Sequence, residues 1–185
     1  MSEQMTNSFS VEITETSKSC AVGEKVAARN LHESCTPVIS CEGACIRGEI
    51  ARLAANMVAK EPSFARSCHG ELIAVPDSTM AKWVKESSSV VLIDGCFLRC
   101  HGRILENLLP KGCLEEFDAL SFYKKYTDVF DADAVPEEER IAAARRVADA
   151  VLERFAGCSD GAPSPRRNEN HDEPCCVPEE KCCGQ

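Results

Sequence analysis

The stretch Val90-Val91-Leu92-Ile93-Asp94-Gly95-Cys96-Phe97-Leu98-Arg99-Cys100 joins an apolar run to two cysteines that are separated by three residues. The β-branched run predicts a buried parallel strand. Residues 101–109 follow with Ile104, Leu105 and Leu108 at the spacing of one helix face. The pattern therefore predicts a strand, a cysteine-bearing turn and a helix, and a thiol against the positive end of a helix favours its thiolate form.

The same pattern occurs once more upstream, in residues 37–60. Residues 37–40 predict a short buried strand, Cys41 and Cys45 form the second Cys-x-x-x-Cys, and residues 46–60 have a broad apolar helix face that Pro62 ends. In each pair we expect the first cysteine near the helix cap and the second in the first turn. Two such turns at one edge of a sheet would place four sulfurs close together.

Further elements are expected on both sides of these two units. Residues 71–75 and 117–122 predict strands, and Ser78 is positioned to cap a helix over residues 79–85. Pro136 and three glutamates open the last helix, which has a long apolar stripe and which Gly157 can end. Residues 9–14 alternate as a short strand does, and residues 23–31 predict one or two helical turns.

Apolar strands that alternate with helices predict an α/β fold, a small three-layer parallel sheet of about four strands with flanking helices. Both cysteine turns then lie at the carboxyl ends of strands, where such sheets form their sites. We divide the chain into a polar, partly ordered N-terminal extension (1–33), an α/β metal-binding domain (34–157) and a disordered cysteine-rich tail (158–185).

The composition narrows the class of protein. The chain of 185 residues has a net charge of −9, which argues against nucleic acid as a partner. It shows no signal-peptide pattern and no apolar stretch that would span a membrane. We therefore expect a cytoplasmic protein. Thirteen cysteines in a reducing compartment indicate metal-binding or redox groups more often than a disulfide framework.

The four cysteines of the two turns, Cys41, Cys45, Cys96 and Cys100, are the first candidate metal ligands. Two facing pairs could close around one ion, because four sulfurs about 2.3 Å from a zinc ion lie roughly 3.8 Å apart. The alternative is that they are small buried side chains at helix starts. Cys68 precedes the run at 71–75, and it can join the cluster if that segment crosses the top of the sheet.

Two histidines and one aspartate also lie near these cysteines in the sequence. His69 and His101 are possible nitrogen ligands, and the alternative for each is a solvated histidine in a loop or at a helix start. Asp94 can act as an acceptor that orients a metal ligand or can serve only the chemistry of the turn. Buried or incidental thiols are the interpretation for the four cysteines without partners at a useful spacing, Cys20, Cys35, Cys113 and Cys158.

The tail contains two vicinal pairs, Cys175-Cys176 and Cys182-Cys183. Four thiols within nine residues and outside any predicted core are hard to explain as packing. Soft ions prefer thiolates, so these cysteines form a possible auxiliary metal site. The competing interpretation is a thiol-rich appendage that oxidises easily.

The segment from Ile93 to Cys100 and its helix resemble the DGC-domain family, which is named after the Asp-Gly-Cys motif at residues 94–96. Residues 40–43 are similar to the first cysteine turn of that family, and the match spans about residues 36–125. The resemblance implies a small cytosolic α/β domain that holds zinc. It implies Cys41, Cys68, Cys96 and Cys100 as ligands, and the choice between Cys45 and Cys68 stays open.

The leading hypothesis is a zinc-binding protein, or one that holds another thiophilic ion, with a thiolate site at the strand–helix turns. One alternative is capture and delivery of a soft metal or metalloid through the tail, and another is a thiol redox or iron–sulfur electron-transfer role. No general base for a cysteine nucleophile can be named, so we expect a binding protein rather than an enzyme. The sequence identifies no protein partner.

Overall fold

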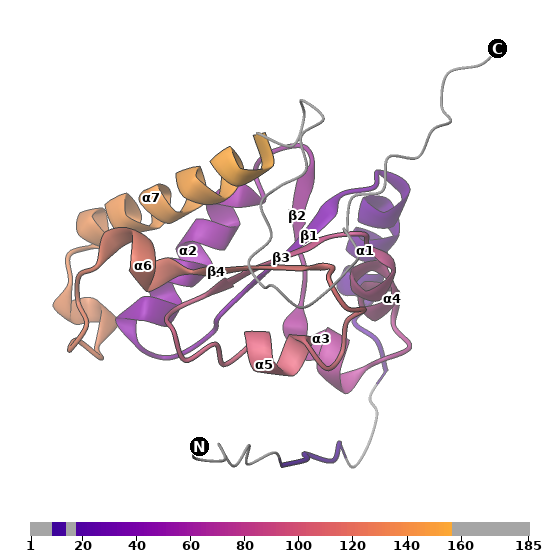
Figure 1. Ribbon diagram of the computed structural model, residues 1–185. Helices are drawn as coiled ribbons and strands as arrows, with labels where there is room; N and C mark the ends of the chain where they lie inside the picture. Colours follow the sequence, from indigo (N-terminus) through magenta and orange to yellow (C-terminus); the bar gives the residue numbers. More distant parts are fainter. Residues whose placement is uncertain (1–8, 14–17, 157–185) are drawn as a thin grey trace, which may run out of the picture.

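A single parallel sheet forms the centre of the protein (Figure 1). The computed structural model describes residues 9–13 and 18–156. Its strands are paired in the order β2-β1-β3-β4, and all three pairings are parallel. Their bounds are Thr36–Ser40 (β1), Phe64–Arg66 (β2), Val90–Asp94 (β3) and Leu114–Asp118 (β4). The predicted α/β class with a four-strand parallel sheet is confirmed.

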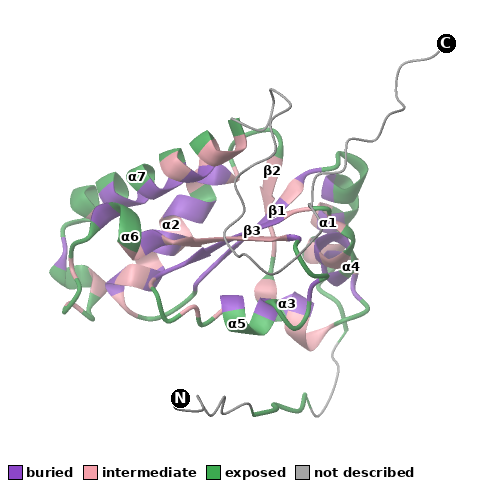
Figure 2. Cartoon of the chain, viewed as in Figure 1, coloured by how far each residue is buried: buried purple, intermediate pink, exposed green. Residues whose placement is uncertain are grey.

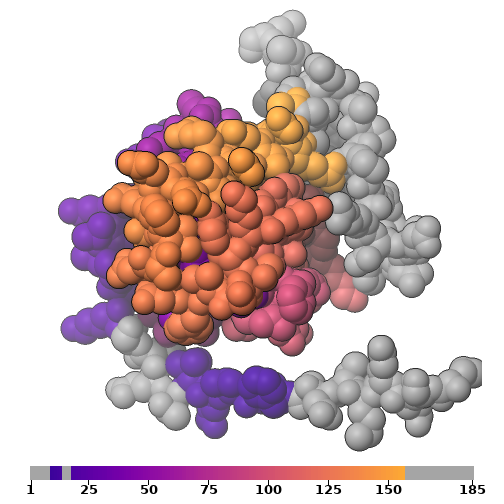
Figure 3. All heavy atoms as spheres, turned by 90° about the vertical axis from the view of Figure 1, so that its left-hand side faces the viewer, coloured from indigo at the N-terminus to yellow at the C-terminus, as the bar shows by residue number. Residues whose placement is uncertain are grey.

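Helices cover both faces of this sheet (Figure 1). Their bounds are Ala21–His32 (α1), Ile46–Val58 (α2), His69–Ala74 (α3), Thr79–Glu86 (α4), Gly102–Leu105 (α5), Ala119–Tyr123 (α6) and Glu137–Ala156 (α7), with a 3-10 turn at Ala132–Ala134. α2, α6 and α7 lie on one side of the sheet, and α1 and α4 lie on the other. Figure 3 looks at the first side, where the orange and yellow segment that contains α7 covers most of the surface.

Alternation along the central strands divides the interior into two cores, which are purple in Figure 2. Val38, Val91 and Ile93 face the cluster formed with α2 and α7. Ile39, Val90 and Leu92 face the cluster that contains residues of α1, α3, α4 and α5. Side chains of successive strand residues point to opposite faces, so a strand buried on both faces must be apolar throughout. β3 meets this requirement from Val90 to Ile93, and its fifth buried residue is Asp94.

Helix ends follow the predicted chemistry where the sequence carried a capping signal. The Ser78 hydroxyl accepts the backbone N–H of Ala81 at 3.1 Å and begins α4. The first turn of α7 contains Glu137, Glu138 and Glu139, where negative charge is favourable. In the part of the chain that the structure describes, no helix is both long enough and apolar enough to cross a membrane.

Three predicted strands were wrong or misplaced. Residues 71–75 lie mostly in helix α3, and the strand of this region is the earlier segment β2. The strand expected at 117–122 is β4, which ends at Asp118, and α6 follows it. Residues 9–13 form no strand and are exposed, with Phe9 87% accessible.

The helix predicted over residues 101–109 contains only the four residues of α5. Leu105 is buried, whereas Ile104 and Leu108 are 45% and 37% exposed, so the expected inward face is present at one position. α1 contributes Ala27 to the second core. The proposed division at residue 33 stays a prediction, and the tail 158–185 and Gly157 lie outside the described residues.

The strand order places a topological switch between β1 and β3. β2, the next strand after β1 in the chain, is one neighbour of β1 in the sheet. After β2 the chain passes back across β1 and forms β3, which is the other neighbour of β1. Turns that leave two such strands run in opposite directions, and the space between them is where open α/β sheets bind ligands. The two Cys-x-x-x-Cys turns follow these two strands.

Candidate metal centre

The turn after β1 is joined to the end of β3 through the backbone. Ser40 pairs with Ile93 in the sheet, and the N–H of Cys41 donates to the Ile93 carbonyl at 2.9 Å. The Cys41 sulfur accepts the N–H of Gly43 at 3.4 Å. Cys41 as a whole is 9% exposed. Cys45 is the N-cap of α2. The prediction that the second cysteine lies in the first helical turn was wrong, because residues 41–44 are not helical and Cys45 lies at the cap itself.

Close packing between glycines holds the two turns together. A Cβ atom on Gly48 would lie 2.1 Å from the Gly43 carbonyl oxygen, and a Cβ on Gly95 would lie 3.0 Å from the Arg47 carbonyl. Real Cβ atoms essentially never approach backbone as closely as at Gly48, and the contact at Gly95 is closer than most real Cβ contacts. Position 48 therefore requires glycine, and a larger residue at position 95 would have to push the start of α2 away. The turn that contains Cys96 is thereby packed directly against the first turn of α2, next to Cys45.

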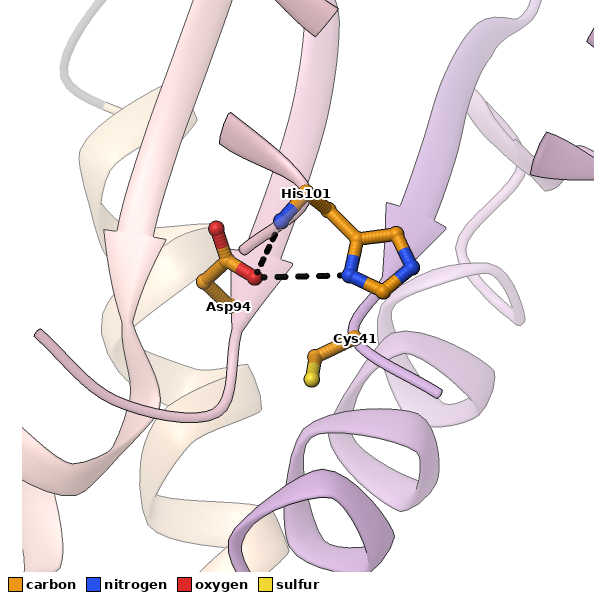
Figure 4. A group of neighbouring side chains, drawn as sticks. All are labelled: Cys41, Asp94 and His101. Carbon is orange, nitrogen blue, oxygen red and sulfur yellow. Dashed lines mark hydrogen bonds and ion pairs between the residues drawn. The ribbon is translucent and has the colours of Figure 1, made fainter. Parts of the chain in front are cut away.

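Asp94 ends β3 and organises the turn that follows (Figure 4). Its carboxylate is buried and accepts the backbone N–H of His101 at 3.3 Å and that of Gly102 at 2.9 Å. The Nδ1 atom of His101 lies 3.7 Å from Oδ1 of Asp94, and the imidazole is 16% exposed. Asp94 therefore forms the turn, and its carboxylate also faces the ring of His101.

Cys41, Asp94 and His101 form one compact group across the two central strands (Figure 4). One ligand atom of each side chain lies within 4.8 Å of the others. Among residues 9–13 and 18–156, no other group of three or more cysteine, histidine or acidic side chains meets this condition. The group combines a soft sulfur, an imidazole nitrogen and a carboxylate oxygen, all of which occur as zinc ligands.

The electrostatics of the group favour charged forms of all three side chains. Burial raises the pKa of Cys41, but contacts with His101 and with the N–H groups of Gly43 and Gly95 outweigh it and lower the pKa below its ordinary value. Asp94 first and Cys41 second raise the pKa of His101 to about 9. The pKa of Asp94 is lowered because its hydrogen-bonding partners outweigh the effect of burial. These interactions therefore favour the thiolate of Cys41, the carboxylate of Asp94 and the imidazolium of His101 more than an exposed position would.

The turn after β2 reaches the same edge of the sheet. The N–H of Ser67 donates to the Val38 carbonyl at 3.1 Å, so Cys68 follows the carboxyl end of a strand and not the amino end. The rings of His69 and His101 meet edge to face, with centroids 5.0 Å apart. Because residues 71–75 are not a strand, Cys68 lies at the same edge as the cysteine turns, where it is exposed and outside the Cys41–Asp94–His101 group.

The structure gathers some of the candidate ligands more closely than others. Cys41 belongs to the compact group. Cys45 and Cys96 are half-buried near the start of α2, and Cys68 and Cys100 are exposed. All eight described cysteines are free of disulfide bonds. The tail cysteines Cys175, Cys176, Cys182 and Cys183 lie outside the described residues.

His101 is the residue that sequence reasoning undervalued. It was weighed as a possible ligand against a solvated histidine and was left out of the candidate ligand set. The available signal was its position directly after Cys100 and seven residues beyond Asp94, where a short turn can bring a histidine back to the carboxylate. That turn is held by Arg99, which bridges Glu106 and Glu116.

Residues 37–112 match the family model of the DGC domain. This part of the chain is similar to a DGC domain. This domain extends from β1 to the residues just before β4, so it includes the three cysteine-bearing turns and the whole Cys41–Asp94–His101 group. The predicted resemblance is confirmed. No curated protein and no solved structure matches the chain.

Proposed function

We propose that the DGC domain of this chain binds zinc at the edge of the sheet between β1 and β3. The Cys41 thiolate and the His101 imidazole are the central ligands in this proposal. Cys45, Cys68, Cys96 and Cys100 are the thiols available to complete four-coordination. The observation that carries the proposal is the convergence of Cys41, Asp94 and His101 from two different strand–helix turns.

The state of His101 supports a metal ligand at this position. Its Nδ1 atom is buried and faces the Asp94 carboxylate, with which it forms an ion pair but no shorter hydrogen bond. Histidines that bind metal usually have a carboxylate beside the ring, which fixes the ring and raises its basicity. Asp94 occupies that place at an ion-pair distance of 3.7 Å. The side chains present therefore fit a zinc ion, with Asp94 orienting the imidazole.

The donor types favour zinc over harder cations. Mg²⁺ and Ca²⁺ take oxygen ligands, whereas Zn²⁺ accepts thiolates and imidazoles and makes no redox demand on the protein. The lowered pKa of Cys41 favours the form of sulfur that binds metal. Free thiols of this kind persist in a reducing compartment such as the cytoplasm, which is the location that we propose.

Elemental analysis of protein made under reducing conditions tests the proposal. The full chain should carry about one zinc per molecule, as expected for a four-ligand site, and Cys41→Ser and His101→Gln should each lower that content. Cys35→Ser is the matched control, because Cys35 is also buried and lies just before the other end of the same strand. Equal zinc in Cys41→Ser, His101→Gln and the control would refute the proposal.

A second candidate function rests on the tail sequence. Its four cysteines in two vicinal pairs have the soft donors that Cu(I) and thiophilic metalloids prefer, so the tail would capture such an ion and the domain would receive it. Deletion of residues 170–185 should then lower binding of a soft ion such as Cu(I) and leave the zinc content unchanged. Equal Cu(I) binding by the full and the shortened chain would refute this function.

A further inference from the structure

Tyr123, at the end of α6, has a buried hydroxyl group with no acceptor. The residue is 4% exposed, and its oxygen has no hydrogen-bond partner among the described residues. Leaving a buried hydroxyl unpaired costs on the order of 1–3 kcal/mol, so such groups need an explanation. The ring itself packs in the core cluster with α2.

Unpaired polar atoms are concentrated on this edge of the sheet. Six buried side-chain nitrogen and oxygen atoms have no partner in the described part of the chain, and three of them belong to Arg47, His101 and Tyr123. His101 belongs to the candidate metal centre, and Arg47 is in the first turn of α2. The hydroxyl of Tyr123 and the Nε–H of Arg47 are donors, so what is missing near them is an acceptor.

The groups around the Tyr123 hydroxyl identify the acceptor. The ionisable side chains that act on it are Arg47, Cys45, Asp118 and Cys96. The carboxylate of Asp118 accepts the N–H of Leu120 at 3.0 Å, where it caps α6, and it forms no hydrogen bond with the Tyr123 hydroxyl. The packing of Gly95 on Arg47 and Gly48 brings the turn that contains Cys96 against the turn that contains Cys45. Two thiols from two different turns are therefore among the ionisable groups that act electrostatically on the Tyr123 hydroxyl.

A neutral thiol is a weak acceptor, whereas a thiolate that binds a metal ion is a good one. We propose that Tyr123 is a positioning residue whose hydroxyl donates a hydrogen bond to the thiolate of Cys45 or Cys96 when these sulfurs bind the metal ion. This inference rests on the proposed function. It would give an acceptor to a buried donor that has no partner among the described residues.

Titration of the metal-free full-length chain with Co²⁺ tests the inference, because the sulfur-to-cobalt charge-transfer band reports on the thiolates. Tyr123→Phe keeps the ring and removes the hydroxyl. We expect about 10- to 100-fold weaker Co²⁺ binding, which is typical when a partner of a metal ligand is lost. The band should also shift to lower energy, because the sulfur loses a hydrogen bond that stabilised its lone pairs.

Tyr126→Phe is the matched control. Tyr126 is the neighbouring tyrosine, its ring centroid lies 6.3 Å from that of Tyr123, and its hydroxyl donates to Glu139. This variant should bind Co²⁺ with the affinity and band position of the unaltered chain. The metal-free Tyr123→Phe variant should unfold at the same temperature as the unaltered chain or higher, because it loses a hydroxyl that has no partner. A clearly lower unfolding temperature would overturn the inference.

Two further variants separate this inference from the proposed function. If Cys45→Ser and Cys96→Ser weaken the charge-transfer band and Tyr123→Phe leaves both affinity and band unchanged, then the inference is wrong and the thiolate site stands. If neither cysteine variant alters the band, then Cys45 and Cys96 do not bind the ion. The inference about Tyr123 and the proposed role of these two cysteines as ligands would then both be wrong. A band shift in Tyr123→Phe that is absent in Tyr126→Phe supports the inference.

Discussion

Replacing Asp94 by asparagine tests the central group of the site without changing its shape. The carboxylate of Asp94 accepts two backbone N–H groups and faces the imidazole of His101. Asparagine keeps one oxygen acceptor, but its amide donor must then face one of the two N–H groups. Charge-assisted hydrogen bonds contribute about 1.5–3 kcal/mol each, and a buried donor left unpaired costs about 1–3 kcal/mol. We expect Asp94→Asn to lower the free energy of unfolding by about 3–4 kcal/mol at pH 6.

The pH dependence of this loss distinguishes the histidine contact from the backbone contacts. The folded pKa of His101 is raised to about 9 from an ordinary value of 6.5. The stability that this shift supplies is complete below pH 6.5 and disappears as the pH rises through 9. One pKa unit corresponds to about 1.4 kcal/mol, and Asp94 shares the effect with Cys41. The difference in the free energy of unfolding between the unaltered chain and Asp94→Asn should therefore become smaller by about 1–2 kcal/mol between pH 6 and pH 9.5.

Urea unfolding in the presence of a chelator measures both quantities without a contribution from metal. The lowered pKa of Asp94 itself affects stability only at acidic pH, since its contribution is lost as the pH falls through the folded value. Asp118→Asn is the matched control, because Asp118 is the register partner of Asp94 on β4 and caps α6 without a histidine contact. The reasoning would be refuted if Asp94→Asn lowered the free energy of unfolding by less than about 1 kcal/mol. It would also be refuted if this loss did not change between pH 6 and pH 9.5.

Two further substitutions test the packing that holds the site. Gly48→Ala places a Cβ atom 2.1 Å from the Gly43 carbonyl oxygen and should lower the free energy of unfolding by at least about 1–3 kcal/mol. Gly70→Ala meets nothing closer than the Cys68 sulfur at 3.9 Å and should be neutral or slightly stabilising, so equal urea midpoints for the two variants would contradict the packing argument. Ser78→Ala removes the N-cap of α4 and should cost about 1 kcal/mol in thermal unfolding. Ser78→Asp should recover most of that loss, and a failure to do so would show that the cap hydrogen bond is not the cause.

The elements that could be predicted from the sequence are those with a strong apolar period. β1 and β3 are short apolar runs before glycine-containing turns, and α2 and α7 have apolar stripes over more than three helical turns. Their burial satisfies the pattern directly, because a strand covered on both faces must be apolar and a helix on a sheet must be amphipathic. The cysteine turns were therefore assigned to the correct edge of the sheet.

The elements that could not be predicted are short and are decided by their neighbours. β2 is three half-buried residues at the sheet edge, and β4 contains Glu115 and Glu116, so neither has the apolar alternation of a strand. The run at 71–75 is apolar enough for a strand, and a run of this length does not distinguish a strand from a helix turn. Its Glu71 is buried beneath the start of α1, where it accepts the N–H of Cys20 at 3.3 Å. That contact cannot be read from local sequence.

Only part of the candidate site could be predicted, because some of its residues are placed by tertiary contacts. Register between β1 and β3 brings Cys41 and Asp94 together, and both were named from the sequence. The orientation of His101 depends on the loop that Arg99 holds through Glu106 and Glu116, which is a tertiary interaction. Tyr123 gave no signal, because its segment has the composition of a strand and its hydroxyl gains meaning only next to the turns of two other strands.

The three turns that meet at this edge belong to three separate crossover connections of the sheet. A bound ion would tie these connections to one another, whereas the sheet beneath them is already secured by its two cores. Loss of the ion would then loosen the rim of the molecule and leave the fold intact. Phe97 and Leu98, which are 69% and 49% exposed, lie between the two cysteines of one such turn. The same turn therefore carries both candidate ligands and an apolar pair at the surface.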